Sequence, residues 1–283
     1  MKERNRKEAG RKEAGRKEAC RKEANRKKVS REETGSKKRI NVKKTAEELL
    51  ELVFPARCPV CDKPVAYFDR ESGICPECMG RLPFIRGKRC YLCGRELAGE
   101  KEELCEDCAG KEGRRFYTRG FALCSYEDVM RESVYRFKYG GRREYAQVYG
   151  RLMAERFKDA MRRAKIEGII PVPLHPAREK QRGYNQAALL AKALGAYTGV
   201  PVYEDYVARV RHTPPMKTLG AAERQNNLKR AFKIRRNDVK LKITIVIDDI
   251  YTTGSTIDAV AKTLINAGVS RVYFMTLAIG GDH

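Results

Sequence analysis

The segment 243–256 constrains the fold more than any other part of the chain. It begins with β-branched residues (243–247), as in strands that are buried on both faces. The acids Asp248 and Asp249 follow, and a Thr-, Gly- and Ser-containing loop then leads into an apolar-periodic helix. From about Phe116 onward, similar strands and helices alternate, which predicts an α/β domain with a mostly parallel sheet flanked by helices.

The adjacent acids Asp248 and Asp249 predict a ligand at the end of that strand. Two like charges repel each other, so a purely structural role for the pair is costly. Carboxylates accept hydrogen bonds from vicinal hydroxyls, and backbone N–H groups at a helix N-terminus favour a phosphate. A ribose 5-phosphate offers both groups. The alternative is an ordinary turn in which Thr and Ser only cap the helix.

The periodicity of the apolar residues predicts the following elements. The expected strands are 168–172, 205–210, 243–247 and 271–278, and the expected helices are 45–54, 126–139, 145–164, 185–198 and 255–267. We divide the chain into a basic tail (1–44), a helix with a cysteine module (45–112) and the α/β domain (113–283).

Four CxxC pairs in series predict two zinc ions. Two residues between cysteines let both thiolates of a tight turn face one ion, and two such turns complete a tetrahedral site without an open position. The ions would therefore be structural. We favour the sequential grouping of the pairs, with an interleaved grouping as the alternative; iron–sulfur ligation and disulfides fit the spacing less well. The predicted ligands are Cys58, Cys61, Cys75, Cys78, Cys90, Cys93, Cys105 and Cys108.

A second polar constellation follows the predicted strand 168–172. Prolines frame a turn at 171–176, the cations Arg178, Lys180 and Arg182 come next, and the start of a helix follows. Such a site at a strand end can bind pyrophosphate. For His175, a hydrogen bond that fixes the turn is the alternative to catalysis.

A polar loop between the two constellations predicts a cover over the site. This hood (211–227) carries few apolar residues, and its candidate contacts are Arg211, Thr213 and Arg224.

The net charge of +23 is unevenly distributed. Residues 1–44 carry 19 Lys or Arg and 7 Asp or Glu, in an RKEAG-like pentad that has no apolar stripe, which predicts a disordered tail. Its basic charge fits a nucleic-acid tether or simply a solvated segment. No apolar run approaches the ~18 residues of a membrane span, and no signal peptide is evident, so we expect a cytoplasmic protein without membrane insertion. The P-loop motif of ATPases is absent from the sequence.

The 243–256 segment resembles the signature of the type I phosphoribosyltransferases, with apolar residues, two acids and a Thr-x-Gly-x-Thr loop. Thr252, Gly254 and Thr256 fill the loop positions. With the cysteine module, the 137–140 turn and the 172–176 run, the likeness narrows to the ComF family, over about residues 45–281. Met216 stands where that family commonly carries Gln, so we expect no polar contact from that position.

The resemblance implies the type I phosphoribosyltransferase fold and binding of phosphoribosyl pyrophosphate (PRPP) with magnesium. It implies that Asp248 and Asp249 hold the ribose hydroxyls, and we assign Arg178 and Arg182 to the departing pyrophosphate. Single-stranded DNA and a ComFA-like helicase are the partners expected of the family. The residues expected to bind PRPP are Asp248, Asp249, Tyr251, Thr252, Thr253, Gly254, Ser255, Thr256 and Lys180.

Three functions fit this sequence. The first is a phosphoribosyltransferase, a glycosyltransferase that acts on an unidentified acceptor. The second is a non-catalytic competence factor that binds single-stranded DNA during DNA uptake. The third is a PRPP-sensing regulator. The first predicts turnover of PRPP, and the second predicts DNA retention that is sensitive to salt. The third predicts neither.

Overall fold

The computed structural model describes residues 55–111, 113, 115–210, 231–235 and 239–280. The pentad tail, the predicted helix 45–54 and the hood, with Arg211, Thr213, Met216 and Arg224, lie outside these residues. The chain divides into two units between Phe54 and Pro55, and the second unit is the one described below.

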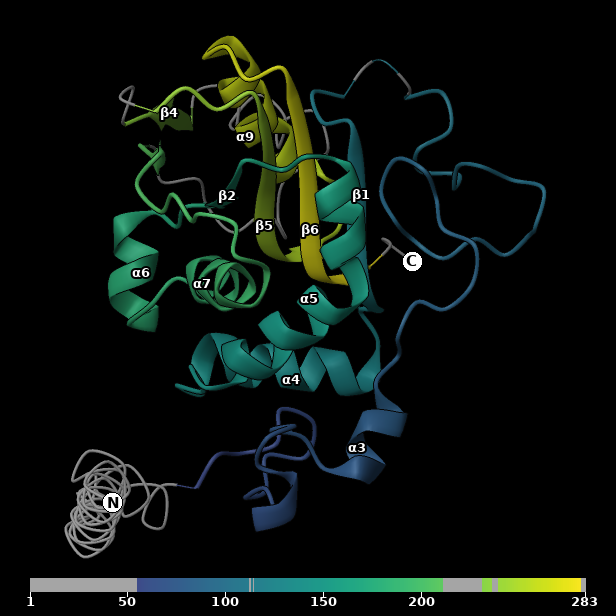
Figure 1. The fold of residues 1–283 in the computed structure, drawn as a ribbon, viewed down its shortest axis with the longest axis vertical. Coiled ribbons are helices and arrows are strands. Elements are labelled where there is room, and N and C mark those ends of the chain that lie inside the picture. The colour runs from purple at the N-terminus through teal and green to yellow at the C-terminus, as the bar shows by residue number, and fades with distance from the viewer. Residues whose placement is uncertain (1–54, 112, 114, 211–230, 236–238, 281–283) are drawn as a thin grey trace, which may run out of the picture. The chain divides into compact units, whose positions relative to one another are not determined.

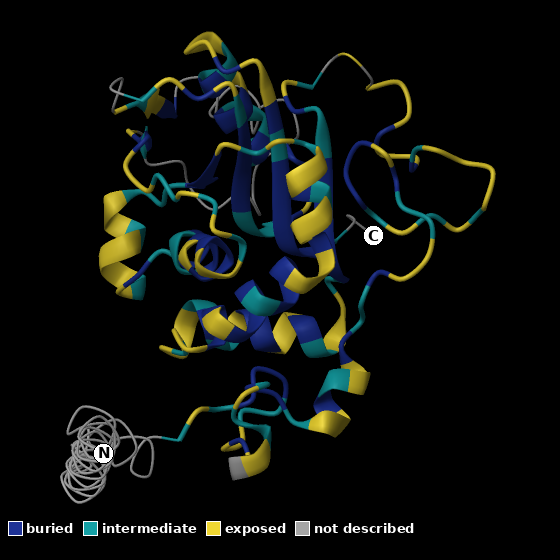
Figure 2. Cartoon of the chain, in the orientation of Figure 1, coloured by how far each residue is buried: buried dark blue, intermediate teal, exposed yellow. Residues whose placement is uncertain are grey.

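A four-stranded parallel sheet forms the centre of this unit (Figure 1). β5 and β6 are the inner strands and are buried over most of their length (Figure 2), as their β-branched and apolar residues predict. The predicted α/β class with a parallel sheet is confirmed. The strands, in the spatial order β1-β6-β5-β2, are β1 (Arg119–Ser125), β6 (Arg271–Ile279), β5 (Ile243–Tyr251) and β2 (Gly168–Pro171).

Helices cover both faces of the sheet (Figure 1). One apolar cluster joins three helices to one face, and a second cluster joins a fourth helix to the other face. Each helix begins and ends within about two residues of its prediction, because its apolar face and its ends are both encoded locally. The first three are α4 (Asp128–Tyr139), α5 (Tyr145–Arg163) and α7 (Gln186–Thr198), and the fourth is α9 (Ser255–Asn266).

The shorter elements differ more from the prediction. The predicted strand 205–210 is only β3 (Val207–Arg209), and it pairs antiparallel with β4 (Phe232–Ile234) outside the main sheet. β1, whose sequence includes Gly120 and Ser125, was not among the predicted strands. The remaining elements are the 3-10 turn η1 (Tyr67–Asp69), α3 (Pro76–Arg81) and α6 (Pro176–Arg182).

No helix in the described ranges is both long and apolar enough to cross a membrane.

Candidate functional site

Asp248 and Asp249 lie within β5 rather than after its end, so the predicted strand 243–247 was too short. In the pairing with β6, Asp248 stands opposite Thr276 and Ile250 stands opposite Ala278. The partner strand thus extends β5 through the acids. Both carboxylates lie toward the carboxyl end of a parallel sheet, where open α/β sheets bind their ligands.

Asp249 forms an ion pair with a residue that was not among the predicted site residues. Its Oδ1 lies 3.0 Å from Nζ of Lys138, and the two side chains are 13% and 17% exposed. Lys138 comes from the last turn of α4. A basic residue within the aromatic turn 137–140 was the only sequence signal for it.

Asp248 is the more perturbed of the two acids. Burial and the neighbouring Asp249 carboxylate raise the pKa of Asp248 to about 7, although Lys138 and Arg209 favour the charged form. One oxygen of Asp248 also accepts the backbone N–H of Asp249 at 2.9 Å. A carboxyl group with a pKa near neutrality can both accept and release a proton at physiological pH.

The loop after β5 ends in Gly254, which precedes α9. Its φ of +75° is one that glycine adopts without strain, and a Cβ there would lie 2.4 Å from the hydroxyl of Tyr251. Gly254 has no side chain with which to cap the first-turn N–H groups of α9. These groups are therefore suited to an anion at the start of the helix.

The other loop residues lie around this turn. The hydroxyls of Thr253 and Ser255 are 3.0 Å apart, whereas Thr252 is exposed and Thr256 lies in the first turn of α9. The side chain of Tyr251 points into the core and stacks on Phe274, with ring centroids 5.0 Å apart. Tyr251 can therefore offer only its backbone to a phosphate.

The three cations of the second constellation lie in α6, but they do not share one face of that helix. Arg178 and Arg182 lie four residues apart and are partly buried on one helical face. Lys180 is exposed, about 200° around the helix from Arg178. His175 caps α6, because its Nδ1 accepts the N–H of Ala177 at 3.2 Å.

Arg182 connects α6 to the turn at the end of α4. Its guanidinium donates to Gln186 Oε1 at 3.0 Å and to the hydroxyl of Tyr139 at 3.2 Å. Lys138, the ion-pair partner of Asp249, belongs to the same turn of α4. The two constellations of the sequence therefore meet around the end of α4.

Arg209 is a candidate site residue that sequence reasoning missed. It is 9% exposed at the end of β3, and its guanidinium carbon lies 5.5 Å from the ring centroid of Phe232. Burial and the charge of Arg178 lower the pKa of Arg209, and Asp248 opposes this shift. A buried arginine within electrostatic reach of Asp248 adds positive charge near the acid pair. The only sequence signal for it was a cation at the end of a short apolar run.

A cavity of about 190 Å³ lies beside the turn after β2. Its lining includes Arg209 and Arg235, but also the acids Glu179, Glu204 and Asp205. This mixed charge does not favour pyrophosphate, so we place the candidate site at the acid pair rather than in this cavity.

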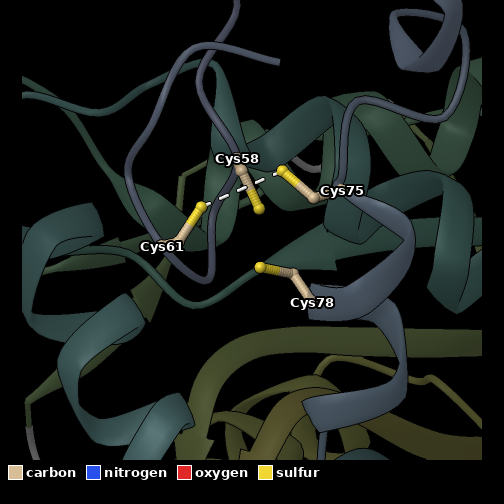
Figure 3. Close-up of side chains that lie close together, drawn as sticks. All are labelled: Cys58, Cys61, Cys75 and Cys78. Carbon is tan, nitrogen blue, oxygen red and sulfur yellow. Dashed lines mark hydrogen bonds between the residues drawn. The ribbon is translucent and has the colours of Figure 1, made fainter. Parts of the chain in front are cut away.

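The eight predicted metal ligands form two compact groups in the sequential order, not the interleaved one. The four Sγ atoms of each group lie within 4.8 Å of one another. The Sγ atoms of Cys61 and Cys75 are 3.9 Å apart (Figure 3), and those of Cys93 and Cys105 are 3.6 Å apart. Four thiolates at about 2.3 Å from a tetrahedral zinc ion would be about 3.8 Å apart, so both groups fit zinc. The groups are Cys58, Cys61, Cys75 and Cys78, and Cys90, Cys93, Cys105 and Cys108.

The two groups organise two ribbons. Ribbon 1 (residues 55–82) joins the apolar cluster of α4, α5 and α7, and ribbon 2 (residues 85–111) joins the cluster of α9. In ribbon 2, Gly94 has a φ of +82° and lies so close to β1 that a Cβ would be 2.8 Å from the carbonyl of Gly120. Gly94 therefore provides the tight turn after Cys93 and also allows the close approach to the sheet.

Cys124 is the remaining cysteine of the described ranges. It lies in β1, fully buried, and burial raises the pKa of its thiol to about 12. It is therefore protonated at neutral pH, as expected of an inert thiol.

The comparisons with known proteins agree with this architecture. Residues 49–109 match the family model of the double zinc ribbon domain. Competence protein F of Haemophilus influenzae is 30% identical over 213 residues, which cover 74% of this chain and 91% of that protein. DNA utilization protein YhgH of Salmonella typhi is 30% identical over 78% of this chain and 96% of its own length. Competence protein ComFC of Bacillus subtilis is 28% identical over 70% and 80%, respectively.

A solved adenine phosphoribosyltransferase resembles 53% of this chain and 84% of its own chain, with a TM-score of 0.32 and 16% identity. This likeness is too weak to assign a family. The family assignment therefore rests on the sequence relatives and on the double zinc ribbon. Since the match to competence protein F spans nearly all of that relative, and the cysteine groups and the ribbon model agree with it, the chain belongs to the ComF family.

Proposed function

We propose that this protein binds PRPP with magnesium at the carboxyl edge of its sheet and transfers the phosphoribosyl group to an acceptor. The observation that carries this proposal is the placement of Asp248 and Asp249 on the strand whose loop leads through Gly254 into α9. Carboxylates suited to the ribose hydroxyls and N–H groups suited to the 5-phosphate are thus a few residues apart, at one edge of the sheet.

The residues would divide the work as follows. Asp248 and Asp249 accept hydrogen bonds from the ribose hydroxyls, and Lys138 fixes the orientation of Asp249. The N–H groups of residues 254–256 hold the 5-phosphate. The bond between C1 of the ribose and the pyrophosphate oxygen breaks, and its electron pair leaves with pyrophosphate. A lone pair of the acceptor then forms the new bond to C1, and a proton carried by the acceptor atom passes to solvent. Arg178 and Arg182, which share one face of α6, would stabilise the leaving group.

The carboxylates of Asp248 and Asp249 are hard oxygen donors, which is the ligand type that magnesium prefers. When bound with PRPP, magnesium would supply positive charge to the pyrophosphate. The hood would cover this edge and exclude water, and Arg211, Thr213 and Arg224 remain its proposed contacts. No described residue identifies the acceptor.

A calorimetric titration of the zinc-loaded protein with PRPP and magnesium tests this proposal. We expect saturable binding, and its loss in Asp248→Ala/Asp249→Ala. The matched control is Glu102→Ala/Glu103→Ala, which removes two adjacent acids from an exposed part of ribbon 2 and should bind PRPP normally. Absence of binding by the folded wild type would overturn the proposal, and so would unchanged binding by the Asp248/Asp249 variant.

We also propose a second function, binding of single-stranded DNA during DNA uptake in the cytoplasm, alongside a ComFA-like helicase. The relatives named for competence and DNA utilization suggest this context. The specific observation is a pair of exposed tyrosines on α4. Tyr135 is 65% exposed, Tyr139 is 56% exposed, and their ring centroids are 5.1 Å apart.

Arg182 adds positive charge to this pair. Its guanidinium carbon lies 5.1 Å from the ring centroid of Tyr139. Exposed aromatic rings beside cations form stacking platforms for unpaired bases, and each stacked base contributes about 1–3 kcal/mol. Duplex bases are already stacked on one another, so this surface fits a single strand better.

Fluorescence anisotropy with a labelled oligothymidylate tests the second function. We expect Tyr135→Ala/Tyr139→Ala to weaken binding at least tenfold and Tyr197→Ala, at another exposed tyrosine, to leave binding unchanged. Affinity should also fall as salt rises. Equal affinities of the double variant and the wild type would rule out this surface.

A further inference from the structure

Three consecutive residues, Arg115, Phe116 and Tyr117, connect ribbon 2 to the loop after β5. Each of the three contacts a different part of the segment 251–258. We propose that this strut (residues 115–117) positions the loop that binds the 5-phosphate in the proposed function (residues 252–256, the phosphate loop). Arg115 does so by fixing the orientation of the peptide between Thr253 and Gly254. This inference rests on the proposed binding of PRPP at that loop.

Arg115 holds the carbonyl group of that peptide. One guanidinium nitrogen donates to the Thr253 carbonyl oxygen at 3.0 Å, and another lies 4.0 Å from an oxygen of Asp258. The Arg115 side chain is 13% exposed, and that of Asp258 is 14% exposed. The contact is therefore sheltered from water, which strengthens it relative to a surface contact.

The orientation of this peptide decides what the loop offers to a ligand. In a trans peptide the C=O and N–H groups point in opposite directions. While the Thr253 carbonyl faces Arg115, the N–H of Gly254 must face away from the strut. Gly254, with φ of +75°, belongs to the one residue type that tolerates many backbone conformations, so this peptide could rotate at low cost without a restraint. Rotation would present a carbonyl oxygen to the phosphate, and the phosphate would be repelled.

The other two residues of the strut fix the loop on either side. The N–H of Phe116 donates to Asp258 Oδ1 at 2.8 Å, which ties the first turn of α9. The hydroxyls of Tyr117 and Tyr251 lie 2.8 Å apart in the core. The Tyr251 ring lies beneath Gly254, where an added Cβ would meet it. The strut thus restrains the loop before, at and after the turn.

The strut is in turn held by ribbon 2. Tyr117 shares an apolar cluster with Cys93 and Cys108, and the N–H of Gly120 donates to the Leu92 carbonyl oxygen at 2.9 Å. The phosphate loop therefore depends on a module that contributes none of the proposed PRPP contacts. Arg115 is a positioning residue in this account, since it acts on the ligand through the Thr253–Gly254 peptide.

The test compares Arg115→Gln, Arg115→Lys and Arg151→Gln with the wild type in two measurements. The first is amide hydrogen exchange of residues 251–258 without ligand, and the second is the Kd for PRPP with magnesium. Arg151 is the matched control, because it also donates to a backbone carbonyl of a ribbon, that of Ser72 in ribbon 1. It lies in α5 on the other face of the sheet.

We expect Arg115→Gln to accelerate exchange in residues 251–258 and to raise the Kd for PRPP at least tenfold. Arg115→Lys should recover most of both properties, because lysine can still donate to the Thr253 carbonyl. Arg151→Gln should change neither. Unchanged exchange of residues 251–258 in Arg115→Gln would overturn the proposal. If exchange responds as expected but the wild type binds no PRPP, the proposed function fails and the positioning role of Arg115 stands.

Discussion

Ribbon 1 and ribbon 2 have the same four-thiolate centre but support different parts of the molecule. Ribbon 1 joins the helical layer, where Asp62 accepts hydrogen bonds from Arg142 at 2.8 Å and from the Tyr145 hydroxyl at 2.6 Å. Ribbon 2 joins the opposite face and, through the strut, the loop after β5. Two cysteine groups of the same composition therefore contact different parts of the fold, one the helical layer and the other the loop after β5.

The difference follows from where each ribbon meets the sheet. The arginine that reaches ribbon 1 from α4, Arg136, donates to the carbonyl of Val60 at 2.7 Å. Arg136 lies in the same helical turn as Lys138, so ribbon 1 reaches the acid pair only indirectly, through that turn. Ribbon 2 instead lies against β1, beside β6, and its continuation passes the start of α9. Loss of ribbon 1 should therefore reduce stability, whereas loss of ribbon 2 should reduce stability and PRPP binding together.

The largest effect is expected on removal of one thiolate from each ribbon, Cys61→Ser in ribbon 1 and Cys105→Ser in ribbon 2. Structural zinc contributes about 10–16 kcal/mol to small zinc domains, and each kcal/mol shifts the unfolding temperature of a domain of this size by about 2–4 °C. Each variant should therefore lose one ion and unfold at least about 20 °C lower. Zinc content by mass spectrometry and thermal unfolding measure this. Only Cys105→Ser should also weaken PRPP binding more than tenfold. Equal weakening by both variants would remove the distinction between the ribbons.

A second comparison uses two carboxylates whose pKa values are shifted in opposite directions. Burial raises the pKa of Asp248 to about 7, so its contribution to stability is complete below its unfolded pKa of about 3.9 and is lost as pH rises through about 7. Burial alone would raise the pKa of Asp62, but Arg142 and Tyr145 lower it, so its contribution is lost only as pH falls below about 3.9.

As pH rises from 5.5 to 8, therefore, the wild type should lose about 2 kcal/mol of stability that Asp248→Asn keeps, so the variant becomes more stable relative to the wild type by that amount. Asp62→Asn should show a constant deficit of about 1–3 kcal/mol over the same range. Urea unfolding of the zinc-loaded proteins at several pH values measures both differences. A gain for Asp248→Asn that does not depend on pH would show that the buried charge is not its cause.

The smallest effect is expected from a matched pair of tyrosine substitutions. Tyr117→Phe leaves the buried Tyr251 hydroxyl without its partner in the strut, and Tyr145→Phe removes a hydrogen bond to Asp62 in ribbon 1. Each should cost about 1–2 kcal/mol of unfolding free energy. Tyr117→Phe should also raise the Kd for PRPP about threefold, and Tyr145→Phe should not change it. A larger effect of Tyr145→Phe on the Kd would reverse the assignment of the two ribbons.

Elements with strong local signals were predictable. α5 and α9 follow apolar residues at helical spacing, and the core of β5 follows its β-branched run. β1 and the hairpin of β3 and β4 were not predictable to the same degree, because short strands are stabilised by their neighbours rather than by their own sequence. For the same reason β5 continues through the acids, where β6 supplies the pairing.

The sequence by itself determined the α/β class, the eight thiolates in CxxC pairs, and the order of strand, acid pair and loop, because each depends on residues close together along the chain. Only the tertiary structure decided which cysteine pairs share a site, that Lys138 and Arg209 lie near the acid pair, and that Arg115 holds the Thr253 carbonyl. These contacts join residues that are far apart in sequence. Their formation depends on the crossing of chain segments over the sheet, and no local pattern encodes that crossing.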